Sequence, residues 1–299
     1  MSTLIDTVRA TAARLDAAGL AFGHGTTNAF DEAAWLVLWR LGLPLDALDE
    51  HAERPLSADE AAAVDTLVQQ RIATRRPAAY LTGEAWLQGL PFTVDERVIV
   101  PRSLIAELVA DADGSGTLDA WLSPTTRRVL DLCTGNGSLA ILAAMAWPDV
   151  DVLATDLSAD ALAVAALNVQ RHGLQQRIRL AQGDGWAAVD ALGEPEPFDL
   201  ILCNPPYVNA RSMAALPAEY RAEPVMSLAG GADGMDFVRP LLAGLAPHLA
   251  RDGVLVLEIG HEIEHFHRAF PRLPIIGLPT SAGDEQVLLI EAPALRFLA

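Results

Sequence analysis

The stretch RVLDLCTGNGS, residues 128–138, decides the fold class of this 299-residue chain. Val129–Cys133 is a short apolar run rich in strand-forming residues, and Gly137–Trp147 has the composition of a buried helix. Between them, Gly135 and Gly137 permit a tight turn that brings the backbone close to a ligand. A strand, a glycine loop and a helix in this order predict the first unit of a parallel α/β sheet with a ligand at its edge.

The same alternation continues toward the carboxyl end of the chain. Further strands are predicted over residues 150–155, 178–180, 200–203 and 254–259, and helices over residues 158–172 and 233–250. A last strand, residues 286–290, is predicted to form the antiparallel edge. Apolar strands separated by helices indicate a mainly parallel sheet with helices on both faces.

Toward the amino end, about the first 80 residues have helical spacing. Helices are predicted over residues 4–15 and 31–41, and Ser57 with Glu60 forms a capping box that opens a third. That helix is predicted to run to about Arg75. We interpret its cations, Arg71, Arg75 and Arg76, as a solvated helix end, with contact to an acidic partner as the alternative.

A change of period then separates the helical segment from the α/β segment. Two short apolar runs around the Gln88-Gly89 turn predict a β-hairpin, followed by a connector that ends at Pro101. A helix over residues 103–110 and a polar, glycine-containing loop over residues 111–116 follow. We therefore divide the chain into a helical domain (1–82), a hairpin linker (83–101) and an α/β domain (102–299).

Composition narrows the possible functions. All 21 basic residues are arginine, which excludes Schiff-base chemistry and a phosphate-loop lysine. The formal charge of −18 repels a phosphate backbone and suits a cationic partner. The amino end has no secretory pattern, and the longest purely apolar stretch has 9 residues, too few to span a bilayer. Together with two cysteines, which we interpret as reduced thiols, these features predict a cytoplasmic protein without a membrane segment.

Two aspartates flank the glycine loop and favour one class of cofactor. Asp156 ends the second strand, where a carboxylate can hold both hydroxyls of a ribose. Residues 135–140 also fit the dinucleotide pattern, but Asp131 beside the loop would repel a pyrophosphate. S-adenosylmethionine, with its sulfonium and ammonium groups, fits better. Asp184 follows the third strand, where it is either near the adenine amino group or a helix cap.

The sequence Asn204-Pro205-Pro206-Tyr207 directly follows the fourth strand. Two prolines fix the backbone and remove two donors, so backbone carbonyls remain available as acceptors. The Asn204 side-chain oxygen adds another acceptor, and Tyr207 offers a flat apolar face. Such acceptors can accept hydrogen bonds from both N–H groups of a planar amide or aromatic amine. They would thereby orient its nitrogen toward an electrophilic methyl group.

These motifs resemble the HemK-type protein glutamine methyltransferases, and the likeness extends over nearly the whole chain. The resemblance implies a class I, Rossmann-like catalytic domain, a helical amino-terminal domain and methylation of a glutamine side-chain amide (N5) by S-adenosylmethionine, without a metal. It implies that Asn204 and Pro205 bind the amide and that Tyr207 packs on it, as the catalytic set. The cofactor residues it implies are Asp131, Cys133, Thr134, Gly135, Asn136, Gly137, Asp156, Leu157, Asp184, Gly185 and Asn204.

Within that family, residues 22–33, residues 94–98 and Cys133 resemble the branch that modifies large-subunit ribosomal protein three. The partner implied is that basic protein or a ribosome assembly intermediate. Substrate contacts are expected from Pro206, Arg102 and Glu107 in addition to the catalytic set, with a linker salt bridge as the alternative for the last two. The same chemistry on the Gly-Gly-Gln loop of release factors is the first alternative.

Other functions are less compatible with the sequence. A DNA adenine N6-methyltransferase shares the Asn-Pro-Pro-Tyr motif, but the charge opposes binding to duplex nucleic acid. A binding factor that retains the fold without catalysis, and a nicotinamide dehydrogenase, are weaker alternatives.

Overall fold

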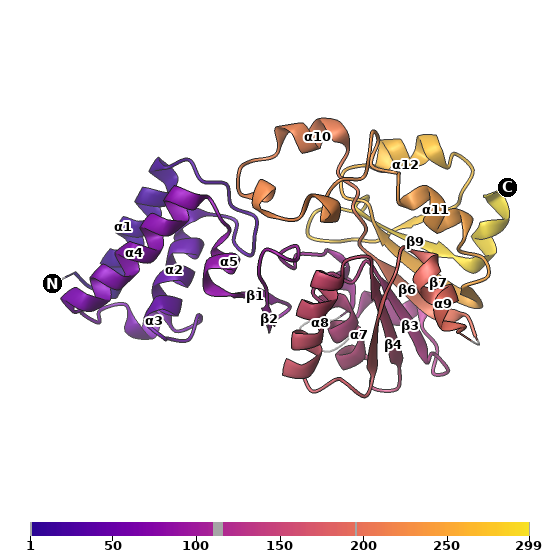
Figure 1. The fold of residues 1–299 in the computed structure, drawn as a ribbon, viewed down its shortest axis with the longest axis horizontal. Coiled ribbons are helices and arrows are strands. Elements are labelled where there is room, and N and C mark those ends of the chain that lie inside the picture. Colours follow the sequence, from indigo (N-terminus) through magenta and orange to yellow (C-terminus); the bar gives the residue numbers. More distant parts are fainter. Residues whose placement is uncertain (1, 110–115, 195, 299) are drawn as a thin grey trace.

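The structure is a computed structural model that describes residues 2–109, 116–194 and 196–298. Figure 1 shows two lobes with a hairpin between them. We call α1–α5 the helical lobe, and everything from α6 onward the sheet lobe. The helical lobe consists of α1 (Leu4–Ala17), α2 (Ala29–Arg40), α3 (Leu48–His51), α4 (Ala58–Thr74) and α5 (Ala78–Thr82).

Capping side chains begin the longer helices of this lobe. Thr3 and Ser57 each accept a hydrogen bond from the backbone N–H three residues later, at Asp6 and Glu60. The carboxylates of Asp6 and Glu60 in turn accept hydrogen bonds from the backbone N–H groups of Thr3 and Ser57. The capping box predicted at Ser57 is therefore confirmed. Asn28 caps α2 in the simpler way. Each cap satisfies N–H groups that the helix itself leaves without a partner.

The end of α4 differs from the prediction. Arg71 has no exposed surface; its Nε donates to Glu32 of α2 at 2.9 Å, and its Nη1 lies 3.7 Å from Glu219 of the sheet lobe. Arg75 also lies close to Glu219, at 3.2 Å. The interpretation of Arg71 as a solvated cation was therefore wrong. A buried guanidinium requires such paired carboxylates, because an unpaired charge is expensive to bury.

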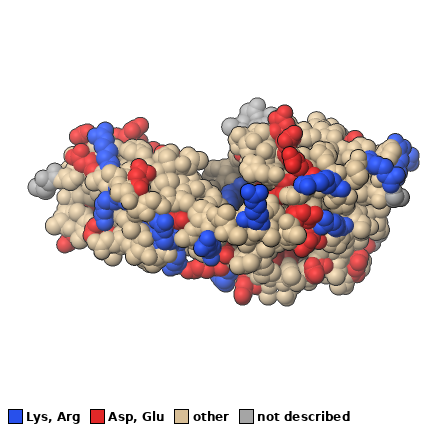
Figure 2. All heavy atoms as spheres, turned by 90° about the horizontal axis from the view of Figure 1, so that it is seen from above, with Lys and Arg blue, Asp and Glu red and all other residues tan. Residues whose placement is uncertain are grey.

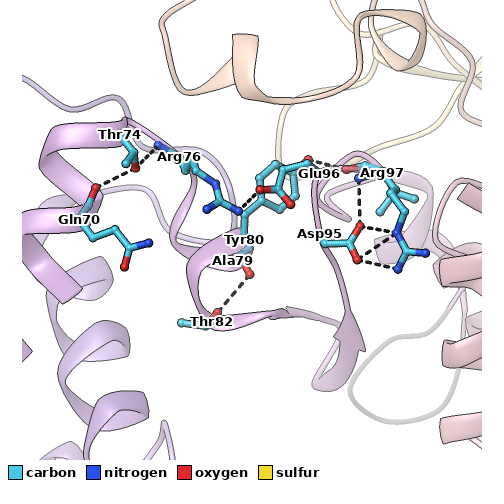
Figure 3. Close-up of polar contacts among 10 residues, drawn as sticks. Gln70, Thr74, Arg76, Ala79, Tyr80, Thr82, Asp95, Glu96 and Arg97 are labelled. Atoms are coloured by element: carbon cyan, nitrogen blue, oxygen red, sulfur yellow. Dashed lines mark hydrogen bonds and ion pairs between the residues drawn. The ribbon is translucent and has the colours of Figure 1, made fainter. Parts of the chain in front are cut away.

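The hairpin is confirmed, with β1 (Glu84–Leu87) paired antiparallel to β2 (Leu90–Thr93). Figure 3 shows the polar contacts that fix the linker to the end of α4. Tyr80 donates its hydroxyl to the Val98 carbonyl at 2.5 Å, and Arg76 is paired with Glu96. These contacts hold the connector in one path between the two lobes.

The central sheet has the strand order β5-β4-β3-β6-β7-β9-β8. Strands β5, β4, β3, β6 and β7 pair in parallel, whereas β9 is antiparallel to both of its neighbours. This is the mainly parallel α/β sheet expected from the sequence. The strands are β3 (Arg128–Leu132), β4 (Asp151–Asp156), β5 (Ile178–Gln182), β6 (Phe198–Cys203), β7 (Leu249–Glu258), β8 (Ile276–Gly277) and β9 (Val287–Glu291).

Each face of the sheet buries its own apolar layer. One layer joins alternate residues of the strands to α6 (Ile105–Val109) and α7 (Ser138–Ala146). The other joins the remaining strand residues to α9 (Trp186–Leu192), α11 (Val238–Ala243) and α12 (Ile263–Ala269). Helix α8 (Ala159–Arg171) contributes to the first layer and, through Ala161 and Val164, to the core of the helical lobe. Helices η1 (Thr117–Trp121) and η4 (Ala292–Phe297) are 3-10 helices.

Two predicted elements need correction. The helix expected over residues 233–250 is only α11, and β7 already begins at Leu249. The helix ends where the Trp186 ring packs against the backbone of Gly244. A Cβ added at Gly244 would lie 2.4 Å from Cδ1 of that ring. The last strand is not the edge of the sheet, because β8 pairs with its outer side. The polar loop predicted over residues 111–116 lies outside the described residues, apart from Gly116.

Between β6 and α11, residues 208–230 leave the sheet and reach toward the helical lobe (Figure 1). We call them the bridging segment. It contains α10 (Ala210–Ala215) and the short 3-10 helices η2 (Tyr220–Ala222) and η3 (Val225–Ser227). No helix among the described ranges is long and apolar enough to cross a membrane.

Candidate active site

A cavity of about 590 Å³ opens at the carboxyl ends of β3, β4 and β6. Strand β3 has β4 on one side and β6 on the other, so the strand order reverses at this point. In open parallel sheets ligands bind at such a reversal. Most of the residues singled out in the sequence line this cavity: Arg102, Cys133, Thr134, Gly135, Asn136, Asp156, Leu157, Asp184, Gly185, Asn204, Pro205, Pro206 and Tyr207.

Asp131 does not line the cavity wall; it lies fully buried behind the glycine loop. One of its carboxylate oxygens, Oδ2, accepts hydrogen bonds from the Thr134 hydroxyl at 2.5 Å and the Ala140 N–H at 3.0 Å. The other oxygen, Oδ1, is buried without a hydrogen-bond partner in the part of the chain that the structure describes. Burial raises the pKa of this carboxyl to about 7.

The loop itself depends on left-handed backbone. Gly135 and Gly137 have φ of 56° and 82°, as their predicted role in a tight turn requires. Cys133 adopts φ of 62° although it is not glycine. The neighbouring Cys203 thiol, together with burial, raises the pKa of Cys133 well above its usual range. Both cysteines are free thiols, and Cys133 faces the cavity in its neutral form.

Asp156 ties the end of β4 to the glycine loop. Its Oδ2 accepts from the Gly135 N–H at 2.9 Å, and its Oδ1 accepts from the Ser158 N–H at 2.8 Å. Burial raises the pKa of this carboxyl. Each carboxylate oxygen retains a lone pair, so the group can still accept from two hydroxyls of a ligand.

The region predicted to contact adenine has two apolar walls. Leu157 is 52% exposed yet lines the cavity, and Phe237 lines it beside Gly185. Asp184 is exposed at the cavity edge. Helix α9 begins at Trp186 with Gly185 as its N-cap and no side-chain cap, so the helix-cap alternative for Asp184 is wrong. Phe237 was missed in the sequence because a single aromatic residue outside a motif has no distinguishing signal.

The Asn-Pro-Pro-Tyr motif follows β6 directly and presents free acceptors to the cavity. In the described ranges, nothing donates a hydrogen bond to the Asn204 side chain or to the Pro205 carbonyl. Asn204 is half-buried and Pro205 is buried. Two acceptors without protein partners at one cavity wall are available to a ligand that brings N–H donors.

Tyr207 is held by a buried carboxylate that was not predicted. Its hydroxyl donates to Glu258 Oε1 at 2.9 Å, while Glu258 Oε2 accepts from the Ser103 hydroxyl at 2.6 Å and the Leu104 N–H at 2.9 Å. Burial raises the pKa of both the Glu258 carboxyl and the Tyr207 phenol. The Tyr207 ring packs so closely on Gly260 that an added Cβ would lie 2.5 Å from its Cε2. Tyr207 is therefore a rigid wall of the cavity.

Arg102 lines the cavity, but its guanidinium is fully engaged with a carboxylate. Its Nη1 and Nη2 donate to the two oxygens of Glu223 at 2.6 and 2.7 Å. The Glu223 Oε1 also accepts from the Val100 N–H at 2.9 Å. Although burial opposes it, the nearby His24 and the hydrogen bonds from Arg102 lower the pKa of Glu223 to about 2. Arg102 thus forms a salt bridge at the cavity wall, which was the alternative to its predicted role as a substrate contact.

Glu107 is not brought to the cavity. Both of its carboxylate oxygens accept from Ser281, one from the backbone N–H at 2.8 Å and the other from the hydroxyl at 2.6 Å. The neighbouring Ala282 does line the cavity. The direct substrate contact expected of Glu107 thus stays a prediction, and in the structure its carboxylate holds the Ser281 loop.

The residues present fit S-adenosylmethionine. The carboxylate of Asp131, buried behind the loop, favours a cationic ligand when it is ionised, and Gly135 leaves the cavity wall without a side chain. Asp156 offers two oxygens to a ribose, and Leu157 and Phe237 offer apolar faces to a base. The cavity continues without interruption from this region to Asn204.

Two family models match the sequence: "PrmC N-terminal domain" over residues 7–83 and "Methyltransferase small domain" over residues 111–219. A solved structure, the hMettl16 catalytic domain in complex with MAT2A 3'UTR hairpin 6, has the same fold, with a TM-score of 0.50. The match has 14% identity and covers 78% of this chain and 81% of that chain. Class I methyltransferase architecture is thereby established for the sheet lobe.

Curated relatives identify the family more closely. A ribosomal protein uL3 glutamine methyltransferase of Bordetella pertussis is 52% identical over 302 residues, which cover 99% of this chain and 97% of that protein. One of Burkholderia pseudomallei is 52% identical over 300 residues, with 99% and 97% covered. With the cofactor cavity and the Asn-Pro-Pro-Tyr wall in place, full-length similarity at this level shows that the chain belongs to the ribosomal protein uL3 glutamine methyltransferases.

Proposed function

We propose that this chain transfers a methyl group from S-adenosylmethionine to the side-chain amide nitrogen of a glutamine in ribosomal protein uL3. The observation that carries the proposal is the pair of unengaged acceptors, the Asn204 side-chain oxygen and the Pro205 carbonyl, at one wall of the cavity. A glutamine amide brings two N–H donors, which match this pair.

The chemistry explains why the site needs acceptors more than a base. An amide nitrogen is a weak nucleophile because its lone pair is delocalised into the carbonyl. When both N–H groups are held by acceptors, the nitrogen is oriented and its partial pyramidalisation is stabilised. The methylated amide then loses its extra proton readily. Tyr207, whose pKa is raised and whose hydroxyl donates to Glu258, serves as a flat wall rather than as a base.

The cofactor supplies an electrophilic methyl group when it is bound. Asp131 and the glycine loop favour its cationic part, Asp156 accepts from the ribose hydroxyls, and Leu157 and Phe237 pack on the base. Pro206 extends the wall formed by Pro205, and Arg102 supports that side of the cavity through its pair with Glu223.

Charge supports a basic protein as the partner. The chain carries a formal charge of −18, and the face in Figure 2 shows acidic side chains on both lobes with a notch in the outline between them. A field of this sign accelerates encounter with a basic ribosomal protein and opposes encounter with duplex nucleic acid.

We further propose that residues 1–82 form a substrate-recognition domain, residues 83–101 a linker and residues 102–299 the catalytic domain. The helices of the first segment share one apolar core, which is extended by two residues of α8 and by linker residues Ala85, Val94, Val98 and Val100.

The direct test follows an isotopically labelled methyl group from S-adenosylmethionine into purified uL3. We expect one methyl group on one glutamine-containing peptide, located by mass spectrometry, and much less label in a release factor or in duplex DNA. Asn204→Ala is expected to lower kcat by roughly 100-fold or more, as for the loss of one preorganised hydrogen-bonding group.

Asn28→Ala is the matched control, since it makes the same chemical change at a helix cap that does not line the cavity. It is expected to cost about 1 kcal/mol of stability and to leave transfer intact. Equal rates for Asn204→Ala and wild type would overturn the assignment of the acceptor pair. Preferential labelling of a release factor would overturn the proposed substrate.

A further inference from the structure

The bridging segment brings three side chains into contact with the helical lobe within five residues of sequence. Glu219 lies between Arg71 and Arg75, and Glu223 lies 3.5 Å from His24. Between these two carboxylates, Tyr220 contacts the helical lobe and also lines the cavity. One residue therefore connects a turn of the helical lobe to the substrate side of the site.

The Tyr220 ring is enclosed on two sides by side chains. The His24 ring, which is only 2% exposed, lies 4.3 Å from it between centroids, at an interplanar angle of 48°. The Arg102 guanidinium lies 5.3 Å from the same ring centroid. Since Arg102 is itself fixed by Glu223, the ring has a defined position at the cavity wall.

Gly23 sets the third boundary. It has φ of 135°, a conformation that side chains rarely adopt, and a Cβ added there would lie 2.2 Å from the Tyr220 hydroxyl oxygen. The turn at residues 23–25 therefore accommodates the phenol only because position 23 has no side chain. This gives a physical role to the Gly-His-Gly sequence of the helical lobe, which the catalytic chemistry does not use.

We propose that Tyr220 determines substrate specificity and that the turn at residues 23–25 positions it. Resting on the proposed function, this assigns to Tyr220 the packing against the peptide chain that flanks the target glutamine. Its neighbours on the cavity wall, Leu216, Met226 and Leu228, are apolar, and the nearby cation Arg102 is paired with Glu223. Such a wall suits a peptide segment rather than a phosphate.

The test is a double-mutant cycle with initial rates measured on uL3. Gly23→Ala is expected to raise KM for uL3 by about tenfold or more with a smaller change in kcat, because the displaced ring weakens substrate binding. Its Kd for S-adenosylmethionine, measured by calorimetry, is expected to stay at the wild-type value. In a Tyr220→Phe chain, which lacks the obstructing oxygen, the same substitution is expected to raise KM much less.

Gly25→Ala is the matched control in the same turn. It also has positive φ, 105°, but its added Cβ would meet only Trp35 at 3.4 Å. We expect its effect on KM to be the same with and without the Tyr220 hydroxyl. This separates backbone strain from the displacement of Tyr220.

The proposal is overturned if Gly23→Ala raises KM equally in the wild-type and Tyr220→Phe chains. It is also overturned if the Kd for S-adenosylmethionine rises in parallel with KM, since that indicates general loss of structure. Both outcomes require that the wild-type chain methylates uL3. Absence of that activity contradicts the proposed function instead.

Discussion

Two buried carboxylates on opposite sides of the cavity have opposite pKa shifts. Asp131, behind the cofactor loop, has two neutral donors on one oxygen and none on the other, and burial raises its pKa to about 7. Glu223, on the substrate side, is also buried, but His24 and Arg102 lower its pKa to about 2. Burial alone therefore does not determine the charge; the partners do.

On one side a buried carboxylate has an oxygen without a partner, and on the other side both oxygens of the carboxylate are paired. On the cofactor side, one oxygen of the buried Asp131 carboxylate has no hydrogen-bond partner among the described residues. On the substrate side, Glu223 of the bridging segment accepts from Arg102 and from the Val100 N–H, and it lies 3.5 Å from His24 of the helical lobe. We expect substitutions on the substrate side to affect stability most, and those on the cofactor side to affect ligand binding.

The largest effect is expected from Glu223→Ala. It removes the buried member of the ion pair and leaves the half-buried Arg102 without its partner, and breaking a buried pair typically costs about 3–5 kcal/mol of unfolding free energy. Urea unfolding followed by circular dichroism measures the change, with Glu53→Ala at an exposed position as the control. A loss of about 1 kcal/mol or less would mean that the substrate side is not held by this ion pair.

Lowering the pH is expected to destabilise the substrate side of the cavity. Because the pKa of Glu223 is about 2 in the folded chain and 4.5 in the unfolded one, its contribution to stability is present above pH 4.5 and is lost as the pH falls toward 2. The wild type is expected to lose on the order of 3 kcal/mol more over this range than Glu223→Gln. Parallel stability curves for the two proteins would contradict the lowered pKa.

On the cofactor side the effect of pH on stability has the opposite sign. A raised pKa of about 7 stabilises the protonated fold, and this contribution declines as the pH rises from about 4 toward 7. A cationic ligand favours the ionised carboxylate, so its binding should release a proton and strengthen by up to about tenfold per pH unit below 7. Calorimetry with S-adenosylmethionine from pH 6 to 8 checks this.

Asp131→Asn is the control for that titration. The amide keeps the shape of the side chain but cannot ionise, so its affinity for S-adenosylmethionine should be weaker and should not depend on pH in this range. If the wild type and Asp131→Asn showed the same pH dependence, another group would be the source.

The smallest effect is expected at Glu107, outside both sides of the cavity. Its two bonds to Ser281 are exposed, so Glu107→Ala is expected to lower unfolding free energy by less than about 1 kcal/mol. We expect less than a threefold rise in KM for uL3, since the carboxylate acts only through the Ser281 loop. A tenfold rise would restore the direct substrate contact expected from the resemblance.

The sequence predicted the cofactor side much better than the substrate side. The loop after β3, Asp156 and Asn204 follow apolar strands, and parallel strands end at one edge, so local pattern suffices to bring them together. Arg102 and Glu223, by contrast, are 121 residues apart, and no periodicity joins them. Tyr220 likewise lies in a segment without helical or strand spacing.

Predictions from the local sequence pattern were also wrong where tertiary packing decides the structure. Residues 233–250 have helical spacing, yet α11 ends at Ala243, before Gly244 meets the Trp186 ring. Arg71 has the sequence context of a solvated helix end but is buried, because its second carboxylate partner comes from the bridging segment. Both errors arise from contacts that a single sequence does not display.

The bridging segment also has a consequence for the order of folding. During synthesis α1–α5 emerge first and can collapse around their own core, since domains fold in order of emergence. Glu219, Tyr220 and Glu223 emerge much later, so their contacts with the helical lobe form only after most of the polypeptide has been translated. A nascent chain stalled before residue 208 would therefore carry folded amino-terminal helices in which Arg71 and Arg75 still lack Glu219.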